Sequence, residues 1–359
     1  MLEQQLIETS RKSNVSDVHI TEGLPVWYRE SGSLKRFKTE VKRSDILDFL
    51  RKHHDSTGIP VEKLEELLNK RGDLDFAMAT GDVRWRGNVY RTDNRKLAMA
   101  MRKLDSTIPA LGDLGLPDTY MQLPQRAKGL LLVTGPTGSG KTTTMASTIG
   151  YMNETSRRHI ITLEDPVEFI HKSNFSLIHQ RQMGGRDGKD FAGSLRAAMR
   201  EDPDVIFIGE MRDRDTVQVA LDAANTGHLV LGTLHTMGAR NTIERIASFF
   251  PADEKDWVQQ VLSSVLVGVL SQVLVPRSDG KGGRTLGYEL LVNSSSVRNA
   301  IREGKVNQIF NAMDTGRNEG QVLMNRCLAE KVQTGEISLD DAMYYSYDPK
   351  ALEKELNHG

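Results

Sequence analysis

From about residue 119 onward, short and almost fully apolar runs alternate with longer stretches of helical periodicity. Strands that are apolar on both faces are typical of a parallel sheet covered by helices on both sides. The pattern therefore predicts an α/β domain over residues 119–359. Its strands are expected at Leu130–Thr134, His159–Leu163, Val205–Ile208 and Leu229–Thr233.

Residues 1–104 predict a smaller α/β domain, because apolar and polar residues there alternate over short segments between glycine-containing turns. Helices are expected at Leu2–Lys12, from a cap at Ser44 through Leu50, and at Val61–Asn69. Strands are expected at Asp17–Ile20, Pro25–Arg29, Asp75–Met78, Val83–Tyr90 and Leu97–Arg102. Residues 105–118 are rich in proline and glycine and predict the linker between the two domains.

The longest apolar stretch, Val261–Val275, contains Ser263, Ser264, Ser271 and Gln272 and is too short and too polar to span a bilayer. Its length favours a buried helix of the core. After about residue 290 the pattern is mostly helical, with helices expected at Val297–Arg302, Val322–Thr334 and Leu339–Tyr345.

Composition narrows the classes of function. The 359 residues carry 47 basic and 48 acidic side chains, which argues against a globally basic surface for nucleic acid. The single cysteine, Cys327, excludes an internal disulfide and a zinc site built from cysteines, and it favours a reducing cytoplasm. The amphipathic, acidic amino terminus is not a signal peptide.

The strongest motif lies between the first apolar run of the larger domain and the helix expected from Thr143 to Met152. It matches the phosphate-binding pattern G-x-x-x-x-G-K-[ST], and a strand–loop–helix context presents backbone N–H groups to phosphate. We therefore expect ATP to bind here, with Lys141 reaching the β- and γ-phosphates and Thr142 ligating Mg²⁺. The candidate nucleotide-binding residues are Gly135, Pro136, Thr137, Gly138, Ser139, Gly140, Lys141, Thr142 and Thr143.

Two acidic segments follow expected strands. Glu164, Asp165 and Glu168 come after the second strand, where carboxylates can orient or deprotonate a water for attack on the γ-phosphate. The alternative is a solvated acidic turn. Glu210 follows the third strand as in a Walker B motif, although Gly209 stands where an aspartate is usual and a chance match stays open.

His228 and His235 lie at opposite ends of the fourth expected strand. A lone histidine is more often structural, but a pair at strand ends after the nucleotide motifs is also suited to sensing the γ-phosphate. Shared metal ligation is disfavoured, because seven residues of extended chain separate them by roughly 20 Å.

Arginines are dense near the end of the first domain, at positions 84, 86, 91, 95 and 102. Arg84 and Arg86 share a face if this segment is a strand. They form either a solvated cationic sheet face or a clamp for phosphate charge, since guanidinium stabilises the charge that develops in phosphoryl transfer.

Taken together, the segments GPTGSGKT, ITLEDPVEF, IFIGEMRD and TGHLVLGTLHT resemble the PilT/PilU family of type IV pilus retraction ATPases, within the secretion ATPase superfamily. The resemblance covers nearly the whole chain. It implies a PAS-like N-terminal domain joined to a RecA-like P-loop ATPase domain, and a homo-hexamer. The family accepts glycine before the Walker B glutamate.

The resemblance also implies residue roles. Glu168 is expected to be the catalytic base, Glu210 to support Mg²⁺ partly through water, and His228 and His235 to form a histidine box. Arg86 and Arg102 match arginines that the N-terminal domain brings to the nucleotide. We expect a cytoplasmic motor at the inner face of the membrane, partnered by the inner-membrane pilus platform protein and a paralogous retraction ATPase, and no nucleic acid.

Retraction is favoured over extension. Extension ATPases carry an additional N-terminal domain, for which 359 residues are expected to be too few, and a four-cysteine zinc site, whereas this sequence has only Cys327. Residues 296–303 partly match the family's C-terminal retraction element, although the match is also compatible with a plain amphipathic helix. The open alternatives are another secretion-superfamily ATPase, a RecA-like nucleic-acid translocase and a catalytically inactive scaffold. The sequence does not decide between PilT and PilU.

Overall fold

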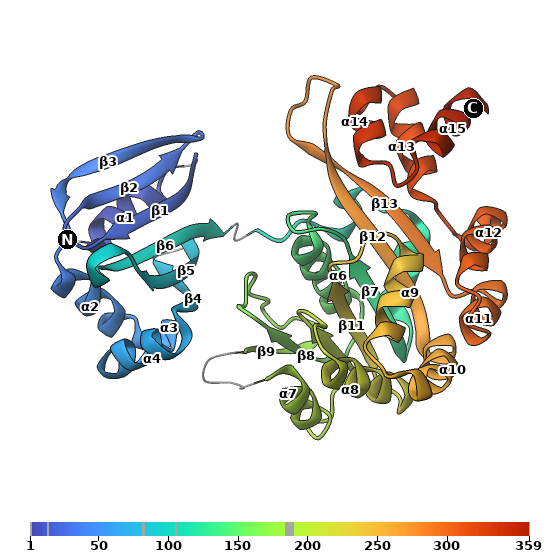
Figure 1. Ribbon diagram of the computed structural model, residues 1–359, viewed down its shortest axis with the longest axis horizontal. Coiled ribbons are helices and arrows are strands. Elements are labelled where there is room, and N and C mark those ends of the chain that lie inside the picture. Colours follow the sequence, from blue (N-terminus) through green and yellow to red (C-terminus); the bar gives the residue numbers. More distant parts are fainter. Residues whose placement is uncertain (1, 13, 81–82, 105–106, 184–189, 359) are drawn as a thin grey trace. The chain divides into compact units, whose positions relative to one another are not determined.

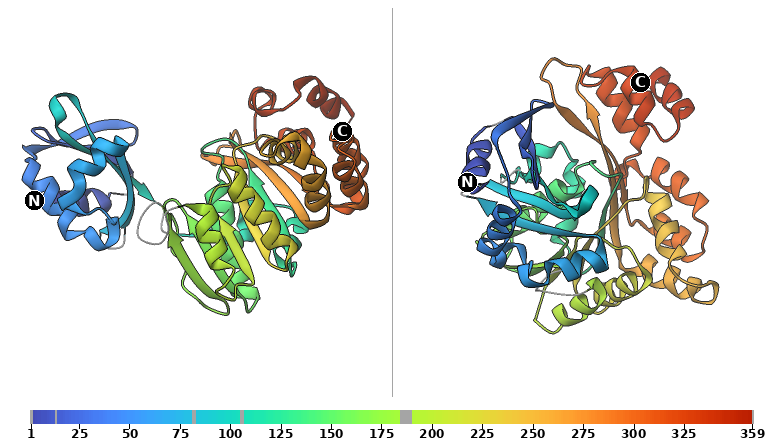
Figure 2. Two further views of the ribbon diagram at one scale, coloured as in Figure 1. Left: turned by 60° about the horizontal axis from the view of Figure 1, so that its bottom comes forward. Right: turned by 60° about the vertical axis from the view of Figure 1, so that its left-hand side comes forward.

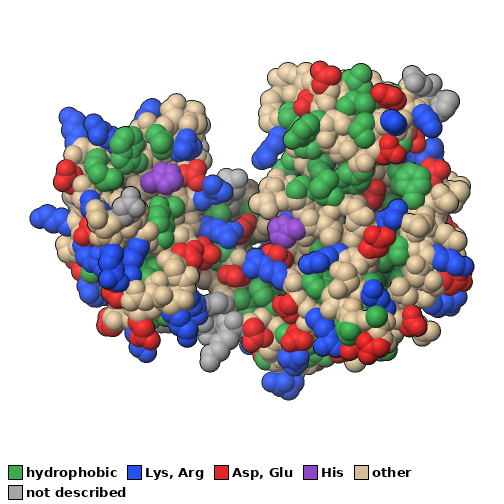
Figure 3. Space-filling view, in the orientation of Figure 1, with side chains coloured by type: hydrophobic (Ala, Val, Ile, Leu, Met, Phe, Trp, Pro, Cys, Tyr) green, Lys and Arg blue, Asp and Glu red, His purple; other side chains and the backbone are tan. Residues whose placement is uncertain are grey.

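The computed structural model describes residues 2–12, 14–80, 83–104, 107–183 and 190–358. The chain forms two compact units. The first comprises Met1–Ile108 with Asp165–Ile170 and Gln182–Lys189, and the second comprises Pro109–Glu164, His171–Arg181 and Asp190–Gly359. On the face drawn in Figure 3, acidic and basic side chains are interspersed over each unit, in keeping with their nearly equal numbers.

The first unit is built on a six-stranded sheet in the order β3-β2-β1-β6-β5-β4, with antiparallel neighbours throughout (Figure 1). Its strands are β1 Val15–Thr21, β2 Pro25–Glu30, β3 Ser33–Glu40, β4 Asp73–Thr80, β5 Val83–Arg91 and β6 Leu97–Leu104. Its helices are α1 Leu2–Ser10, α2 Arg43–Lys52, α3 His54–Thr57 and α4 Leu64–Arg71. Helix and strand side chains meet in one apolar core that includes Leu6, Ile46, Leu64, Phe76 and Trp85.

All five strands expected in this unit are confirmed, but β3 has no counterpart in the sequence prediction. Its side chains are almost all exposed, so no alternation of apolar residues marks it. The expected cap at Ser44 is wrong. Helix α2 begins at Arg43 after Lys42, whose backbone N–H donates to the Asp45 carboxylate at 2.8 Å. That bond satisfies the helix start without the serine hydroxyl.

The second unit holds a seven-stranded sheet in the order β13-β12-β7-β11-β10-β8-β9. Its strands are β7 Gly129–Thr134, β8 His159–Glu164, β9 Leu177–Gln182, β10 Val205–Ile208, β11 Leu229–Leu234, β12 Leu266–Pro276 and β13 Arg284–Val292. The five strands from β12 to β8 are parallel, and β13 is antiparallel to β12. All four expected strands therefore lie in the parallel part, buried on both faces.

Helices cover both faces of this sheet (Figure 2). They are α5 Asp118–Gln122, α6 Lys141–Thr155, α7 Phe191–Ala198, α8 Arg214–Asn225, α9 Ala239–Ser248 and α10 Lys255–Val265. The C-terminal helices are α11 Ser295–Arg302, α12 Asn307–Thr315, α13 Met324–Gln333, α14 Leu339–Tyr345 and α15 Pro349–His358. Of these, α13 to α15 share a small core with β12 that includes Val273, Val275 and Leu328. Among the described residues, no helix is long and apolar enough to cross a bilayer.

The expected helix over Val261–Val275 is wrong, because α10 ends at Val265 and the strand β12 begins at Leu266. This strand is enclosed between β7 and β13 and is buried along nearly its whole length. A run that is apolar on all sides carries neither helix nor strand periodicity, so its pattern does not distinguish the two. Helix α13 likewise starts later than expected, because Val322 pairs with Leu290 instead of entering the helix.

Candidate nucleotide-binding site

The loop between β7 and α6 has the geometry that the sequence predicts. Helix α6 begins at Lys141, directly after Gly140, whose backbone has a φ of 89° that favours glycine. At Gly135 the reason for glycine is different. A Cβ atom there would lie 2.2 Å from the backbone oxygen of Gln272, so the loop could not pass this close to β12 with a side chain.

Lys141 lies over its own loop. Its Nζ donates to the backbone oxygens of Gly135 at 2.8 Å and Pro136 at 3.0 Å. Burial lowers the pKa of Lys141, and the negative charge of Glu210 opposes this shift. The ammonium group therefore lies inside the loop and within the electrostatic reach of the Walker B-like glutamate, where a bound phosphate would replace the carbonyl oxygens as its partner.

Polar atoms left without partners fit a phosphate group. The Ser139 hydroxyl is buried and has no hydrogen-bond partner among the described residues. The Thr142 hydroxyl likewise has no hydrogen-bond partner among the described residues. It lies in the first turn of α6 and is partly exposed. Buried polar groups are normally satisfied, so a free hydroxyl inside a cradle of backbone N–H groups suits an oxyanion, and the partly exposed one suits a metal ion on it.

Gln272 is a site residue that the sequence prediction missed. Its side chain is fully buried, and its Nε2 donates to the backbone oxygen of Ser139 at 2.7 Å. It thereby fixes the phosphate-binding loop from the neighbouring strand β12. The signal in the sequence was a single amide within a largely apolar run that also contains three serines, and that run was expected to form a helix.

Glu210 follows β10 and contacts one arginine and one histidine. Its Oε1 lies 3.2 Å from His235 Nε2, and its Oε2 accepts from Arg212 Nη2 at 2.7 Å. Burial alone would raise the pKa of Glu210, but hydrogen bonds and charges from Arg212 and His235 outweigh this effect and hold it below its usual value. The group therefore stays ionised at neutral pH, as a carboxylate near a metal–phosphate complex must.

The two histidines are separated as the sequence implies. The register pairs Leu229 with Gly129 and Leu234 with Thr134, so His235 emerges at the end of the sheet that carries the phosphate-binding loop. His228 lies at the other end, where its Nδ1–H donates to the backbone oxygen of Ala223 at 3.0 Å. Of the two histidines, His235 is therefore the one that contacts Glu210. The sensing role of both histidines stays a prediction.

The carboxylates after β8 lie in contrasting environments. Glu164 belongs to the second unit, is 7% exposed and accepts hydrogen bonds from Thr162 Oγ1 at 2.6 Å and Gln180 Nε2 at 3.1 Å. Glu168 belongs to the first unit, and its side chain is 25% exposed and lies 3.4 Å from Arg86 Nη1. A carboxylate that must exchange a proton with water needs access to solvent, which favours Glu168.

The arginines of the first unit form a row across its sheet. Arg86 on β5 pairs directly with Arg102 on β6, and Arg102 pairs with Asp17 on β1. The buried Trp85 faces the core, so Arg84 and Arg86 share the opposite face, as predicted. Arg86 contacts Glu168, whereas Arg102 Nε lies 2.9 Å from Asp17 and its side chain is 72% exposed.

Comparison with known proteins decides the family. The model of the family described as "Type II/IV secretion system protein" matches residues 4–344. This chain belongs to that family. Within it, the chain is 39% identical to the type IV pilus retraction ATPase PilT of Pseudomonas aeruginosa, over 94% of this chain and 96% of that protein. It is 33% identical to the type IV pilus ATPase PilU of the same organism, over 96% of this chain and 88% of that protein.

A solved structure extends the likeness to the fold of this secretion ATPase. The crystal structure of the pilus retraction motor PilT with bound ADP superposes with a TM-score of 0.86. The two chains are 44% identical, and the match covers 98% of this chain and 99% of that one. The chain is thus a PilT-family ATPase with an N-terminal α/β domain and a P-loop ATPase domain, as its sequence predicted.

Proposed function

We propose that this chain is the ATP-hydrolysing motor of type IV pilus retraction and that it works as a homo-hexamer. The observation that carries the proposal is the phosphate-binding loop, with Lys141 and the free Ser139 hydroxyl, in a chain that resembles PilT over nearly its full length. The higher identity to PilT than to PilU supports a PilT-like role.

The residue roles follow from the local chemistry. Backbone N–H groups of residues 137–143 and the Lys141 ammonium hold the phosphates of ATP. Thr142 and Glu210 would hold Mg²⁺, which supplies charge neutralisation on the β- and γ-phosphates. Glu168 accepts a proton from the attacking water, and Arg86 and Arg102 offset the charge that develops on the phosphoryl group. His235 orients Glu210 through their contact.

The partners are proposed from the same family likeness. A cytoplasmic ring at the inner face of the membrane would act on the pilus platform protein, together with a paralogous retraction ATPase. Each hydrolysis event biases a conformational equilibrium of the ring, and that bias is what a mechanical motor converts into movement.

A deletion strain tests the function directly. Loss of this chain should leave pili on the cell surface in excess and abolish twitching, and expression of the wild-type chain should restore both. Complementation with a Lys141→Ala variant should fail. Normal twitching in the deletion strain, or ATP turnover by the purified protein that depends on DNA, would contradict a retraction motor.

A further inference from the structure

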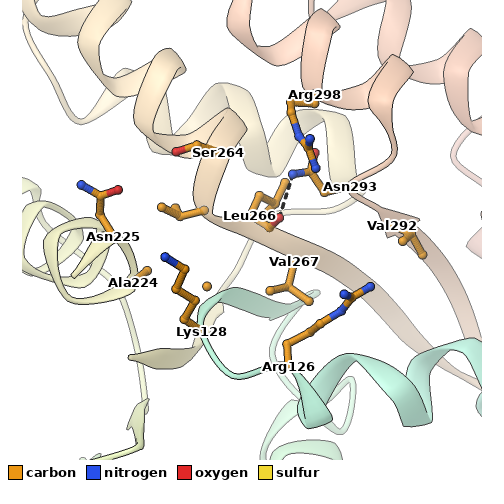
Figure 4. Close-up of a pocket in the computed structure, with 12 residues that line it drawn as sticks. Arg126, Lys128, Ala224, Asn225, Ser264, Leu266, Val267, Val292, Asn293 and Arg298 are labelled. Atoms are coloured by element: carbon orange, nitrogen blue, oxygen red, sulfur yellow. Dashed lines mark hydrogen bonds between the residues drawn. The ribbon is translucent and has the colours of Figure 1, made fainter. Parts of the chain in front are cut away.

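A pocket of about 310 Å³ opens in the second unit, at the end of the sheet opposite the phosphate-binding loop (Figure 4). Gly129 and Leu266, the first residues of β7 and β12, line it, as does Val292 at the end of β13. The loop follows the last residue of β7, so the strand separates the two sites by roughly 17 Å. We call this site the basal pocket.

Three cationic side chains from two segments of the chain line the basal pocket. Arg126 and Lys128 precede β7, and Arg298 lies on α11 (Figure 4). No Asp or Glu is among the lining residues, and the described part of the chain offers no ion pair to any of these cations. Elsewhere on this unit arginines find carboxylates, as Arg277 does with Asp279 and Glu336.

All three cationic side chains are exposed, and a counter-charge supplied from outside would stabilise them together. Three like charges around one cavity repel one another, and the repulsion is larger beside low-dielectric walls than in open solvent. The walls here are partly apolar, formed by the valine and leucine side chains of β12 and β13. An occupant that brings carboxylates together with some apolar surface matches both properties.

Asn293 adds a requirement for a hydrogen-bond donor. Its Nδ2 donates to the backbone oxygen of Leu266 at 2.8 Å (Figure 4) and to that of Ser263 at 3.0 Å. These two acceptors fix the orientation of the amide. Its Oδ1 is buried and has no partner among the described residues. A simple inorganic anion is a poor donor, whereas a peptide backbone supplies N–H groups.

We propose that the basal pocket docks an acidic segment of a partner protein, whose carboxylates pair with Arg126, Lys128 and Arg298 while a backbone N–H donates to Asn293. The basal pocket lies at one end of β7 and β12. The other end of β7 leads into the phosphate-binding loop, and β12 carries Gln272 further along its length. The inference does not depend on the partner's being part of a pilus.

The test is binding of a short fluorescein-labelled peptide of alternating Glu and Leu to the full-length protein, measured by fluorescence anisotropy. Saturating ADP keeps the peptide out of the phosphate-binding loop. We expect the affinity for this peptide to fall at least tenfold in Lys128→Glu and in Arg298→Glu, and to fall as salt is raised. A matched Gln/Leu peptide should bind at least tenfold more weakly than the Glu/Leu peptide.

The control variant is Arg284→Glu, which makes the same charge change at the first residue of β13, remote from Val292 at the end that lines the pocket. Its affinity should stay within twofold of wild type, and basal ATP turnover should be normal in Lys128→Glu. Equal weakening in Arg284→Glu would overturn the proposal. So would binding of pyrophosphate or of phosphatidylglycerol vesicles through the same cations without binding of the peptide. Lys128→Gln, a milder change, should weaken the peptide in the same direction.

Discussion

At the scale of single residues, the nucleotide site depends on a few charges whose surroundings the fold sets. Lys141 is half-buried over its own loop, and Glu210 is held ionised between Arg212 and His235. These two groups feel each other's charge, which is how a phosphate-binding lysine remains protonated despite burial.

Replacing Lys141 by alanine should abolish ATP turnover and leave the fold intact. The change removes the cation that offsets γ-phosphate charge, and the hydrogen bonds lost are to loop carbonyls only. Steady-state phosphate release and thermal melting of the purified variant check both halves. Turnover near the wild-type rate in the folded variant would contradict the assignment.

The acidic segment after β8 permits a direct comparison of two carboxylates. Glu168→Gln should still bind ATP but hydrolyse it at least ~100-fold more slowly, the usual scale for loss of acid–base catalysis. Glu164→Gln should retain turnover and lose stability, because its carboxylate accepts buried hydrogen bonds. The opposite result, with Glu164→Gln inactive and Glu168→Gln active, would show that the base was assigned to the wrong residue.

His171 makes stability depend on pH. Burial lowers its pKa from 6.5 to about 4, so the unfolded chain binds the proton more readily. The contribution of this group is fully present above pH 6.5 and is lost as pH falls toward 4. At pH 5 the loss is about 2 kcal/mol. As the pH falls from 7 to 5, the melting temperature of His171→Gln should therefore rise relative to that of wild type. A difference in melting temperature that stays the same at both pH values would refute this.

At the scale of elements, the nucleotide loop is supported from the side as well as from its ends. Strand β12 approaches so closely that Gly135 has no room for a Cβ, and its Gln272 donates to Ser139. A second polar contact joins β13 to α9, the helix that follows His235 in the chain. The buried Glu289 on β13 accepts from the backbone N–H of Ala239 at the start of α9, at 2.7 Å.

The support from β12 is testable with Gln272→Met, which preserves volume but leaves the Ser139 carbonyl oxygen without a donor. Loss of a buried hydrogen bond costs about 1–3 kcal/mol, and the loss falls on the loop that holds the phosphates. We expect the KM for ATP to rise about tenfold with a smaller change in kcat. Leu270→Met on the same strand is the matched control and should leave both constants near wild type.

At the scale of the whole molecule, the groups assigned to hydrolysis are divided between the two compact units. The phosphate-binding loop, Glu210 and His235 lie in the second unit, whereas Arg86, Arg102 and Glu168 lie in the first. The arginine row is therefore the contribution of a unit that has no phosphate-binding loop of its own.

A fragment of residues 109–359 should bind ADP with nearly the affinity of the full chain but hydrolyse ATP at least ~10-fold more slowly, because it lacks both arginines. Calorimetry and steady-state turnover measure the two quantities, and melting of the fragment establishes that it is folded. Arg86→Ala and Arg102→Ala in the full chain should lower kcat in the same direction. Full turnover by the folded fragment would make the row a solvated surface.

The sequence alone determined the nucleotide loop and the parallel strands. Glycines and Lys141 act through backbone geometry within a few consecutive residues, and strands buried on both faces are uniformly apolar, so both features are local. The order and spacing of the motifs along the chain sufficed to indicate the PilT-like fold, which the superposition confirms.

Only the tertiary structure decided contacts between distant segments. It turned the second half of Val261–Val275 into a strand and brought Gln272 to the loop. It also separated Glu164 from Glu168 and gathered Arg126, Lys128 and Arg298 around one pocket. Strand register and the packing of whole elements set these neighbours, and no periodicity within a single segment encodes them.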